Sequence, residues 1–99
     1  MKFDYVFAEG NKTVVDVYKM NEELDKLLDE NGVWCEVVVH HNRIEIEKHW
    51  GDWKHDHLRL KYLVGEYLIQ NGIKYEHDEV VTEEDGSDCY SAIHYFYFK

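Results

Sequence analysis

Histidine and carboxylate side chains give this sequence most of its chemical capacity, with seven His and twenty-one Asp and Glu among 99 residues. Zinc binds such groups when three or four donors converge at about 2 Å. His77 and His94 are expected on one face of a C-terminal hairpin, with Glu79 beside them. Cross-strand neighbours lie near 5 Å apart, so this group is the first candidate metal site.

A second histidine group lies in the middle of the chain. His49, Asp52 and His55 can converge across the start of a helix. His55 and His57 cannot, because residues two apart on a helix point about 200° away from each other. Neither group shows a complete ligand set with standard spacing. The alternative function is therefore a metal-binding domain or metal-dependent enzyme, with zinc as cofactor and these candidate ligands: His49, His55, His57, His77 and His94.

Carboxylates dominate the C-terminal quarter of the sequence. Seven acids and no Lys or Arg lie between Tyr75 and Phe98, among many tyrosines and phenylalanines. Aromatic rings bury area at low entropic cost, and carboxylates steer a basic partner. We therefore expect a non-enzymatic binding protein that meets a basic protein partner through these residues: Glu76, Asp78, Glu79, Glu83, Glu84, Asp85, Asp88, Tyr95 and Tyr97.

The sharpest form of this expectation is mimicry of nucleic acid. A surface studded with carboxylates can imitate a phosphate backbone and occupy the groove of a nucleic-acid-handling enzyme, which it would inhibit. Inhibitors of bacterial defence nucleases resemble this chain in composition alone. A solvated acidic surface that only maintains solubility is the competing interpretation. A third makes the protein a subunit of an assembly, with Tyr95 and Tyr97 in the interface.

Composition argues against several other classes. A net charge of −10 disfavours direct binding to nucleic acid or anionic membranes. Cys35 and Cys89 are too few for a disulfide framework, and no apolar run is long enough to span a membrane. Cys89 and His94 lie five residues apart on one strand, so they face opposite sides and cannot act together in catalysis. We expect a cytoplasmic protein with a single domain over residues 1–99.

Two helices are expected to position these side chains. Apolar residues repeat at helical spacing from Val17 to Leu28, and Asn31-Gly32 ends that helix. Residues 13–18 fit either a helix start capped by Thr13 or a strand paired with residues 3–7. The second helix runs from an Asp52 cap to residue 71 and is apolar around most of its circumference. Trp34, Trp50 and Trp53 are expected to seal the core where helix meets sheet. The alternative for Trp50 and Trp53 is contact with a small molecule or a protein.

Two hairpins follow the helices. Residues 33–40 and 43–48 pair through a turn at 41–42, which sets Val39 opposite Ile44. Residues 73–82 and 89–98 pair through a two-residue turn at 85–86, which sets His77 opposite His94. Segments 27–33 and 67–73 align without a gap, which suggests repeated helix–strand–strand units. The expected fold is α+β in two layers, with two helices on one face of a mostly antiparallel sheet of about five strands.

Overall fold

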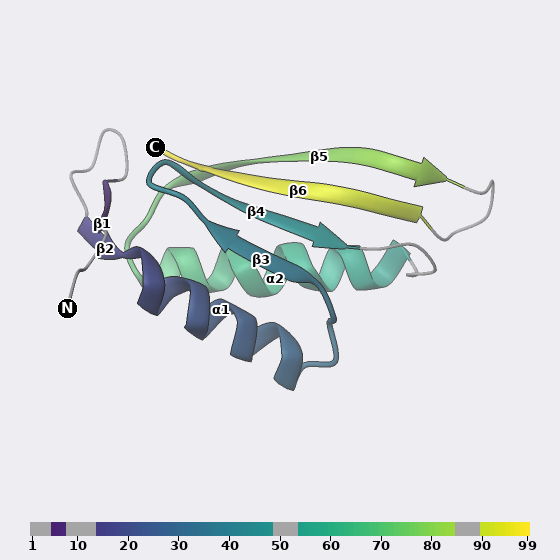
Figure 1. The fold of residues 1–99 in the computed structure, drawn as a ribbon, viewed down its shortest axis with the longest axis horizontal. Helices are drawn as coiled ribbons and strands as arrows, with labels where there is room; N and C mark the ends of the chain where they lie inside the picture. Colours follow the sequence, from purple (N-terminus) through teal and green to yellow (C-terminus); the bar gives the residue numbers. More distant parts are fainter. Residues whose placement is uncertain (1–4, 8–13, 49–53, 85–89) are drawn as a thin grey trace.

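The computed structural model describes residues 5–7, 14–48, 54–84 and 90–99 (Figure 1). Eight elements follow one another in the described residues: β1 (Tyr5–Phe7), β2 (Val14–Asp16), α1 (Val17–Glu30), β3 (Glu36–Val39), β4 (Arg43–Lys48), α2 (Lys54–Gln70), β5 (Tyr75–Glu84) and β6 (Tyr90–Phe98). The expected α+β class is confirmed, with two helices packed on an antiparallel sheet.

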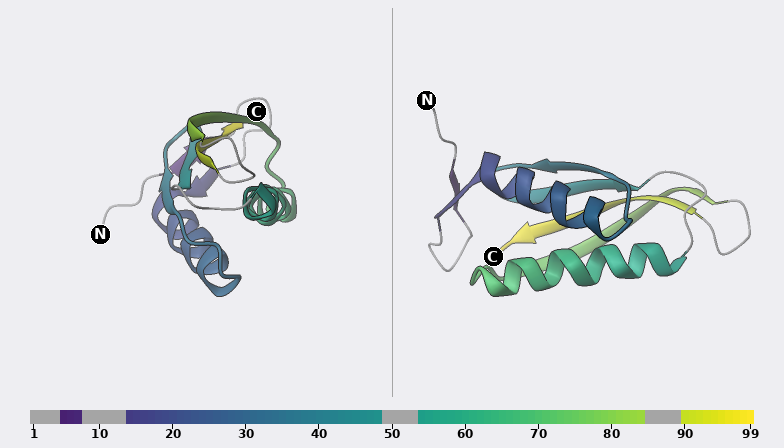
Figure 2. Two further views of the ribbon diagram at one scale, coloured as in Figure 1. Left: turned by 90° about the vertical axis from the view of Figure 1, so that its right-hand side faces the viewer. Right: turned by 90° about the horizontal axis from the view of Figure 1, so that it is seen from below.

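The main sheet has four antiparallel strands in the order β3-β4-β6-β5. Both helices lie on the same side of it (Figure 2). The core between the two layers is aliphatic and aromatic. Its fully buried apolar side chains come from both helices, from β4 and β6, and from the residue that follows each helix-ending glycine: Met20, Leu24, Leu28, Val33, Ile44, Ile46, Leu60, Val64, Leu68, Ile73 and Phe96. None of the described helices combines the length and the apolar character needed to cross a membrane.

The N-terminal hairpin does not extend the main sheet, so the expected count of about five strands is wrong. β1 and β2 form a separate two-stranded sheet at one end of the molecule (Figure 1). A side chain of α1 already occupies the free edge of β3, because the Val39 backbone N–H donates to Asn21 Oδ1 over 2.9 Å. A fifth strand would need that same backbone donor.

The start of α1 settles the open alternatives for residues 13–18. Val14–Asp16 is a strand paired with Tyr5–Phe7, and the helix begins at Val17. Asp16 is the N-cap, and its carboxylate accepts the Lys19 backbone N–H at 3.1 Å. The helix start capped by Thr13 is therefore wrong, because residues 14–16 are extended. The Asp52 cap expected for α2 lies outside the described residues.

The two helices end in the same way, as the aligned segments predict. Gly32 and Gly72 have φ angles of 71° and 72°. At the first end Val33 N donates to Leu28 O, and at the second Ile73 N donates to Leu68 O, both at 2.9 Å. Each end is a Schellman motif, in which a glycine in the left-handed conformation lets the chain leave the helix. Each is followed by a hairpin, so the order α1-β3-β4 is repeated in α2-β5-β6.

The first hairpin has the expected register, with Val39 opposite Ile44 and Glu36 opposite Glu47. The second does not. His77 lies opposite Phe96, Glu79 lies opposite His94, and the pairing of Glu84 with Tyr90 excludes the expected two-residue turn. A bulge interrupts the pairing between Val81 and Glu83. From Tyr75 to Val81 the shift amounts to two residues, which keeps each side chain on its expected face. The hydrophobic pattern therefore cannot distinguish the two registers.

Candidate functional site

The side of the main sheet that faces away from α1 and α2, which we call the outer face, is covered by no helix among the described residues (Figure 2). Alternate residues of its four strands point there. Their register places β6 in the middle, flanked by carboxylates on β4 and on β5. The outer face consists of Glu36, Val38, Arg43, Glu45, Glu47, Glu76, Asp78, Val80, Ile93, Tyr95 and Tyr97.

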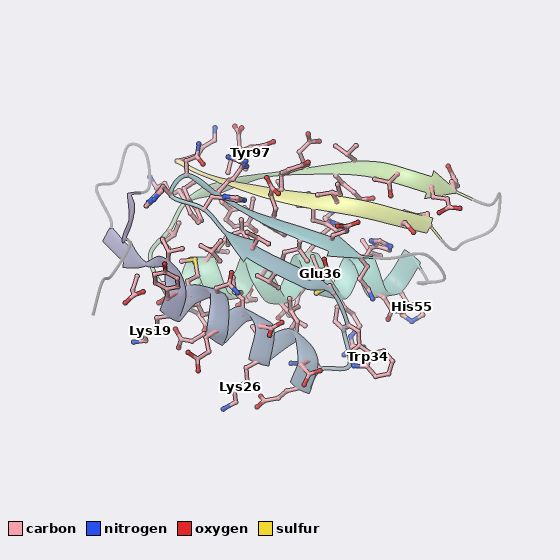
Figure 3. The ribbon with its side chains drawn as sticks, in the orientation of Figure 1. Lys19, Lys26, Trp34, Glu36, His55 and Tyr97 are labelled. Carbon is pink, nitrogen blue, oxygen red and sulfur yellow. The ribbon has the colours of Figure 1, made fainter. Side chains whose placement is uncertain are left out.

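Two stacked tyrosines form the centre of the outer face. The rings of Tyr95 and Tyr97 lie 5.8 Å apart at an angle of 11°. Tyr97 is exposed and projects from the sheet on the side opposite the helices (Figure 3). Tyr95 pairs with Glu45 on one side and with Asp78 on the other. The centre is therefore aromatic and both of its flanks are acidic.

Cations neutralise part of this acidity. Arg43 Nη2 lies 2.8 Å from Glu45 Oε1, and Lys99 Nζ pairs with Glu76. Arg43 is the one cation among the outer-face residues, against five carboxylates. Since exposed ion pairs contribute little free energy, these contacts can be exchanged for contacts with a partner.

The structure separates the residues predicted to bind a partner. Glu76, Asp78, Tyr95 and Tyr97 belong to the outer face, whereas Glu79 lies on the opposite, helix-covered face. Two others, Glu83 and Glu84, are exposed at the end of β5. The last two, Asp85 and Asp88, lie outside the described residues.

A cluster of histidines lies on the helix-covered face, between α2 and the β5–β6 hairpin. His57 and His94 are completely buried. His57 Nδ1 lies 2.9 Å from His94 Nε2, and His94 Nδ1 lies 3.0 Å from His77 Nε2. Glu79 Oε1 lies 3.6 Å from His94 Nδ1. Donor atoms of His77, Glu79 and His94 all lie within 4.8 Å of one another, the only such metal-ligand group among the described residues.

Tyr90, the first residue of β6, contacts both His57 and Glu79 of this cluster. Its ring stacks on that of His57, with centroids 4.1 Å apart and planes at 9°. Its carbonyl oxygen lies 2.9 Å from His57 Nε2, and its hydroxyl donates to the Glu79 carboxylate. Burial, together with that hydrogen bond, raises the pKa of Tyr90 to about 12. We call His57, His77, Glu79, Tyr90 and His94 the histidine cluster.

Burial also governs the protonation of the imidazoles. It lowers the pKa of His94 to about 3, and the neighbouring His57, His77, Lys61 and Lys48 act in the same direction. Burial likewise lowers the pKa of His77, followed by the effect of Lys61. Both rings are therefore neutral at pH 7, the state in which imidazole binds metals.

The metal ligands proposed from the sequence are thus placed differently. His77, His94 and Glu79 come together as expected. His55 is exposed at the start of α2 (Figure 3) and does not belong to this group, while His57 is buried. This agrees with the prediction that His55 and His57 do not converge. His49 lies outside the described residues. His57 was named among the candidate ligands, but its contact with His94 was not predicted, because only the packing of α2 on β6 brings the two rings together.

Of the three tryptophans, the described residues include only Trp34, and its position differs from the expected one. Trp34 is 76% exposed, so the expectation that it seals the core is wrong. It follows Val33, which is buried at the end of the Schellman motif, and alternation along the extended chain then turns Trp34 outward. The Trp34 side chain lines a surface groove together with Asp25 and Asp29 of α1. Trp50 and Trp53 lie outside the described residues.

A scan against protein-family models finds no match for the chain, and searches of curated proteins and of solved structures also find none. Its function is therefore inferred from its own residues.

Proposed function

We propose that the protein is a non-enzymatic binding protein whose outer face engages a basic protein partner. The observation that carries this proposal is the stacked Tyr95–Tyr97 pair, which lies between two carboxylate-bearing strands on a sheet face that α1 and α2 leave uncovered. Aromatic side chains contribute much of the binding energy at protein interfaces. Carboxylates around them accelerate encounter with a positively charged surface.

The finer form of the proposal is inhibition of a nucleic-acid-handling enzyme by phosphate mimicry. Outer-face acids recur at alternate residues along one strand, as Glu45 and Glu47 do on β4 and Glu76 and Asp78 on β5. Negative charges thus lie in pairs along the two strands that flank β6. Rows of negative charge are what a phosphate-binding groove recognises, and the net charge of −10 adds long-range attraction.

The test compares outer-face variants with matched controls. Glu76→Lys/Asp78→Lys reverses two outer-face charges, whereas Glu30→Lys/Glu66→Lys makes the same charge change on the helices. Tyr95→Ala/Tyr97→Ala removes the tyrosine pair, and its control Tyr18→Ala/Tyr62→Ala removes two exposed helix tyrosines. Each protein is immobilised, exposed to nuclease-treated source-cell lysate and eluted with salt, and the eluted proteins are identified by mass spectrometry.

We expect one basic protein to be retained by the wild type and by both controls, and to be lost by both outer-face variants. With that partner purified, the dissociation constant should rise by roughly tenfold or more in the outer-face variants, which corresponds to about 1.4 kcal/mol. Duplex DNA should compete for the same partner if phosphate mimicry is correct. Equal retention of the same proteins by all five would contradict the proposal.

The assembly-subunit alternative uses the same tyrosines but a second copy of the chain. Sedimentation of the wild type across a hundredfold concentration range distinguishes it, because self-association through Tyr95 and Tyr97 would raise the apparent mass with concentration. A constant monomer mass leaves the basic partner as the occupant of the outer face.

A further inference from the structure

The histidine cluster occupies positions that are aliphatic in the other half of the molecule. Because both helices end in the same Schellman motif, Leu28 corresponds to Leu68, a shift of 40 residues. The same shift sets one buried or half-buried valine against each of three cluster residues: Val17 against His57, Val37 against His77 and Val39 against Glu79.

The fourth correspondence comes from strand pairing. Ile44 is the partner of Val39, and His94 is the partner of Glu79, so His94 stands where the first unit has a buried isoleucine. Burying polar groups contributes less to stability than burying aliphatic ones, even when the polar groups are hydrogen-bonded. Since the first unit shows that this architecture accepts aliphatic side chains there, folding alone does not account for the cluster.

Hydrogen bonding determines which nitrogen of each buried ring carries the proton. The Tyr90 carbonyl oxygen can only accept, so His57 Nε2 carries a hydrogen and donates to it. A His57 ring whose hydrogen is on Nε2 has its lone pair on Nδ1, so His94 Nε2 donates to His57 Nδ1. The lone pair of neutral His94 is therefore on Nδ1.

Two other atoms that can bind a metal lie close to that lone pair. His77 Nε2 lies 3.0 Å from His94 Nδ1, and Glu79 Oε1 lies 3.6 Å from it. Two ligands of one tetrahedral zinc ion, each at 2.0–2.1 Å, lie roughly 3.4 Å apart. His77 and Glu79 are two residues apart on one strand, and His94 is on the next strand, so the backbone presents all three from one face.

We propose that His77 Nε2, His94 Nδ1 and one Glu79 oxygen bind a single divalent transition-metal ion of the zinc class. The remaining parts of the cluster form the outer shell of such a site. His57 accepts the second N–H of His94, and Tyr90 donates to Glu79. Partners of this kind orient metal ligands and raise their affinity. His77 and Glu79 are only partly buried, so a water molecule can take a fourth coordination position.

Metal binding changes one proton position in the cluster. Without metal, His77 Nε2–H donates to the lone pair of His94 Nδ1. With metal, the hydrogen of His77 moves to Nδ1 and both lone pairs bind the ion, so each imidazole stays neutral. The ion also separates the His94 lone pair from the Glu79 carboxylate, which repel each other in its absence. This site lies on the helix-covered face and is independent of partner binding at the outer face.

The test is zinc titration by calorimetry of protein first treated with EDTA and then freed of chelator. Co²⁺ serves as a second probe, because its visible absorption reports the geometry of its ligands. We expect one ion per chain. His77→Gln and Glu79→Gln should each weaken binding by at least about a hundredfold, and Tyr90→Phe by about tenfold. His55→Gln, which removes an exposed histidine, should leave binding unchanged.

Circular dichroism of each variant tests whether it is folded. Because His77 and Glu79 are only partly buried, their replacements are the least disruptive ligand variants. Absence of zinc binding by the wild type up to millimolar concentration would overturn the proposal. So would unchanged binding by folded His77→Gln and Glu79→Gln. If zinc binds but only His55→Gln weakens it, the ion lies at the start of α2 and the assigned ligands are wrong.

Discussion

The hydroxyl group of Tyr75 lies over the α-carbon of Gly65, in the space that a β-carbon at position 65 would fill. Gly65 is in the interior of α2, where glycine costs about 1 kcal/mol relative to alanine. Tyr75 packs against the core and against the ring of Phe96 at 5.7 Å, so its ring has little freedom to move aside. The glycine is therefore explained by close approach of a strand side chain to the helix.

We expect Gly65→Ala to destabilise the wild type by about 1 kcal/mol or more, because the clash with Tyr75 exceeds the gain in helix propensity. In a Tyr75→Phe background the nearest ring atom is 3.4 Å away, an ordinary contact. The same substitution should then stabilise the protein by up to about 1 kcal/mol. Urea denaturation of the four proteins measures both effects. A stabilising Gly65→Ala in both backgrounds would contradict this account.

The two Schellman glycines give a paired prediction. Gly32 and Gly72 have positive φ angles, and a β-carbon at either would meet nothing within 4 Å. The cost of Gly→Ala is therefore a backbone cost of about 1 kcal/mol or slightly more at each site. We expect the free energy of unfolding, measured by urea denaturation, to fall equally in the two single variants and by the sum of both losses in the double variant. Asn tolerates this conformation better, so Gly32→Asn should cost less than Gly32→Ala, and an equal or greater cost would show that the side chain clashes.

The buried imidazoles predict an acid-sensitive stability in the metal-free protein. The pKa of His94 is about 3 in the folded state, against an ordinary value of 6.5, so between these pH values the unfolded chain binds a proton that the folded chain does not. The stability that neutral His94 contributes to the folded state is thus fully present above pH 6.5 and is lost as the pH is lowered. Each such proton changes the free energy of unfolding by about 1.4 kcal/mol per pH unit. His77, whose pKa is also lowered, makes the dependence of the unfolding free energy on pH steeper.

Urea denaturation in EDTA between pH 6.5 and pH 5 measures this slope above the range in which most carboxylates titrate. His77→Gln should reduce it, and His55→Gln should not. The charged and titratable groups that contact these two rings or act on them electrostatically are Lys48, His57, Lys61, Asp78, Glu79 and Tyr90. A stability that stays constant over this range would show that His94 becomes protonated without unfolding.

Local sequence patterns were sufficient to predict much of the fold. The helical spacing from Val17 to Leu28 and the two Asn-Gly signals predict both helix ends, because a glycine in the left-handed conformation acts within a few residues. The register of the first hairpin follows from its two-residue turn and the alternation around Val39 and Ile44. These features depend on neighbours along the chain, so the order of residues determines them.

Tertiary structure decided the remainder. The second hairpin has a register two residues away from the expected one, which alternation cannot detect, and this brings Glu79 opposite His94. Asn21 occupies the edge of β3, so the N-terminal hairpin stays outside the main sheet. The packing of α2 on β6 brings His57 to His94, which lies 37 residues away along the chain. Residue types and the alternation of strand faces identified the His77, His94 and Glu79 group. The orientation of their donor atoms depends on contacts between distant elements, and only the packed structure supplies those contacts.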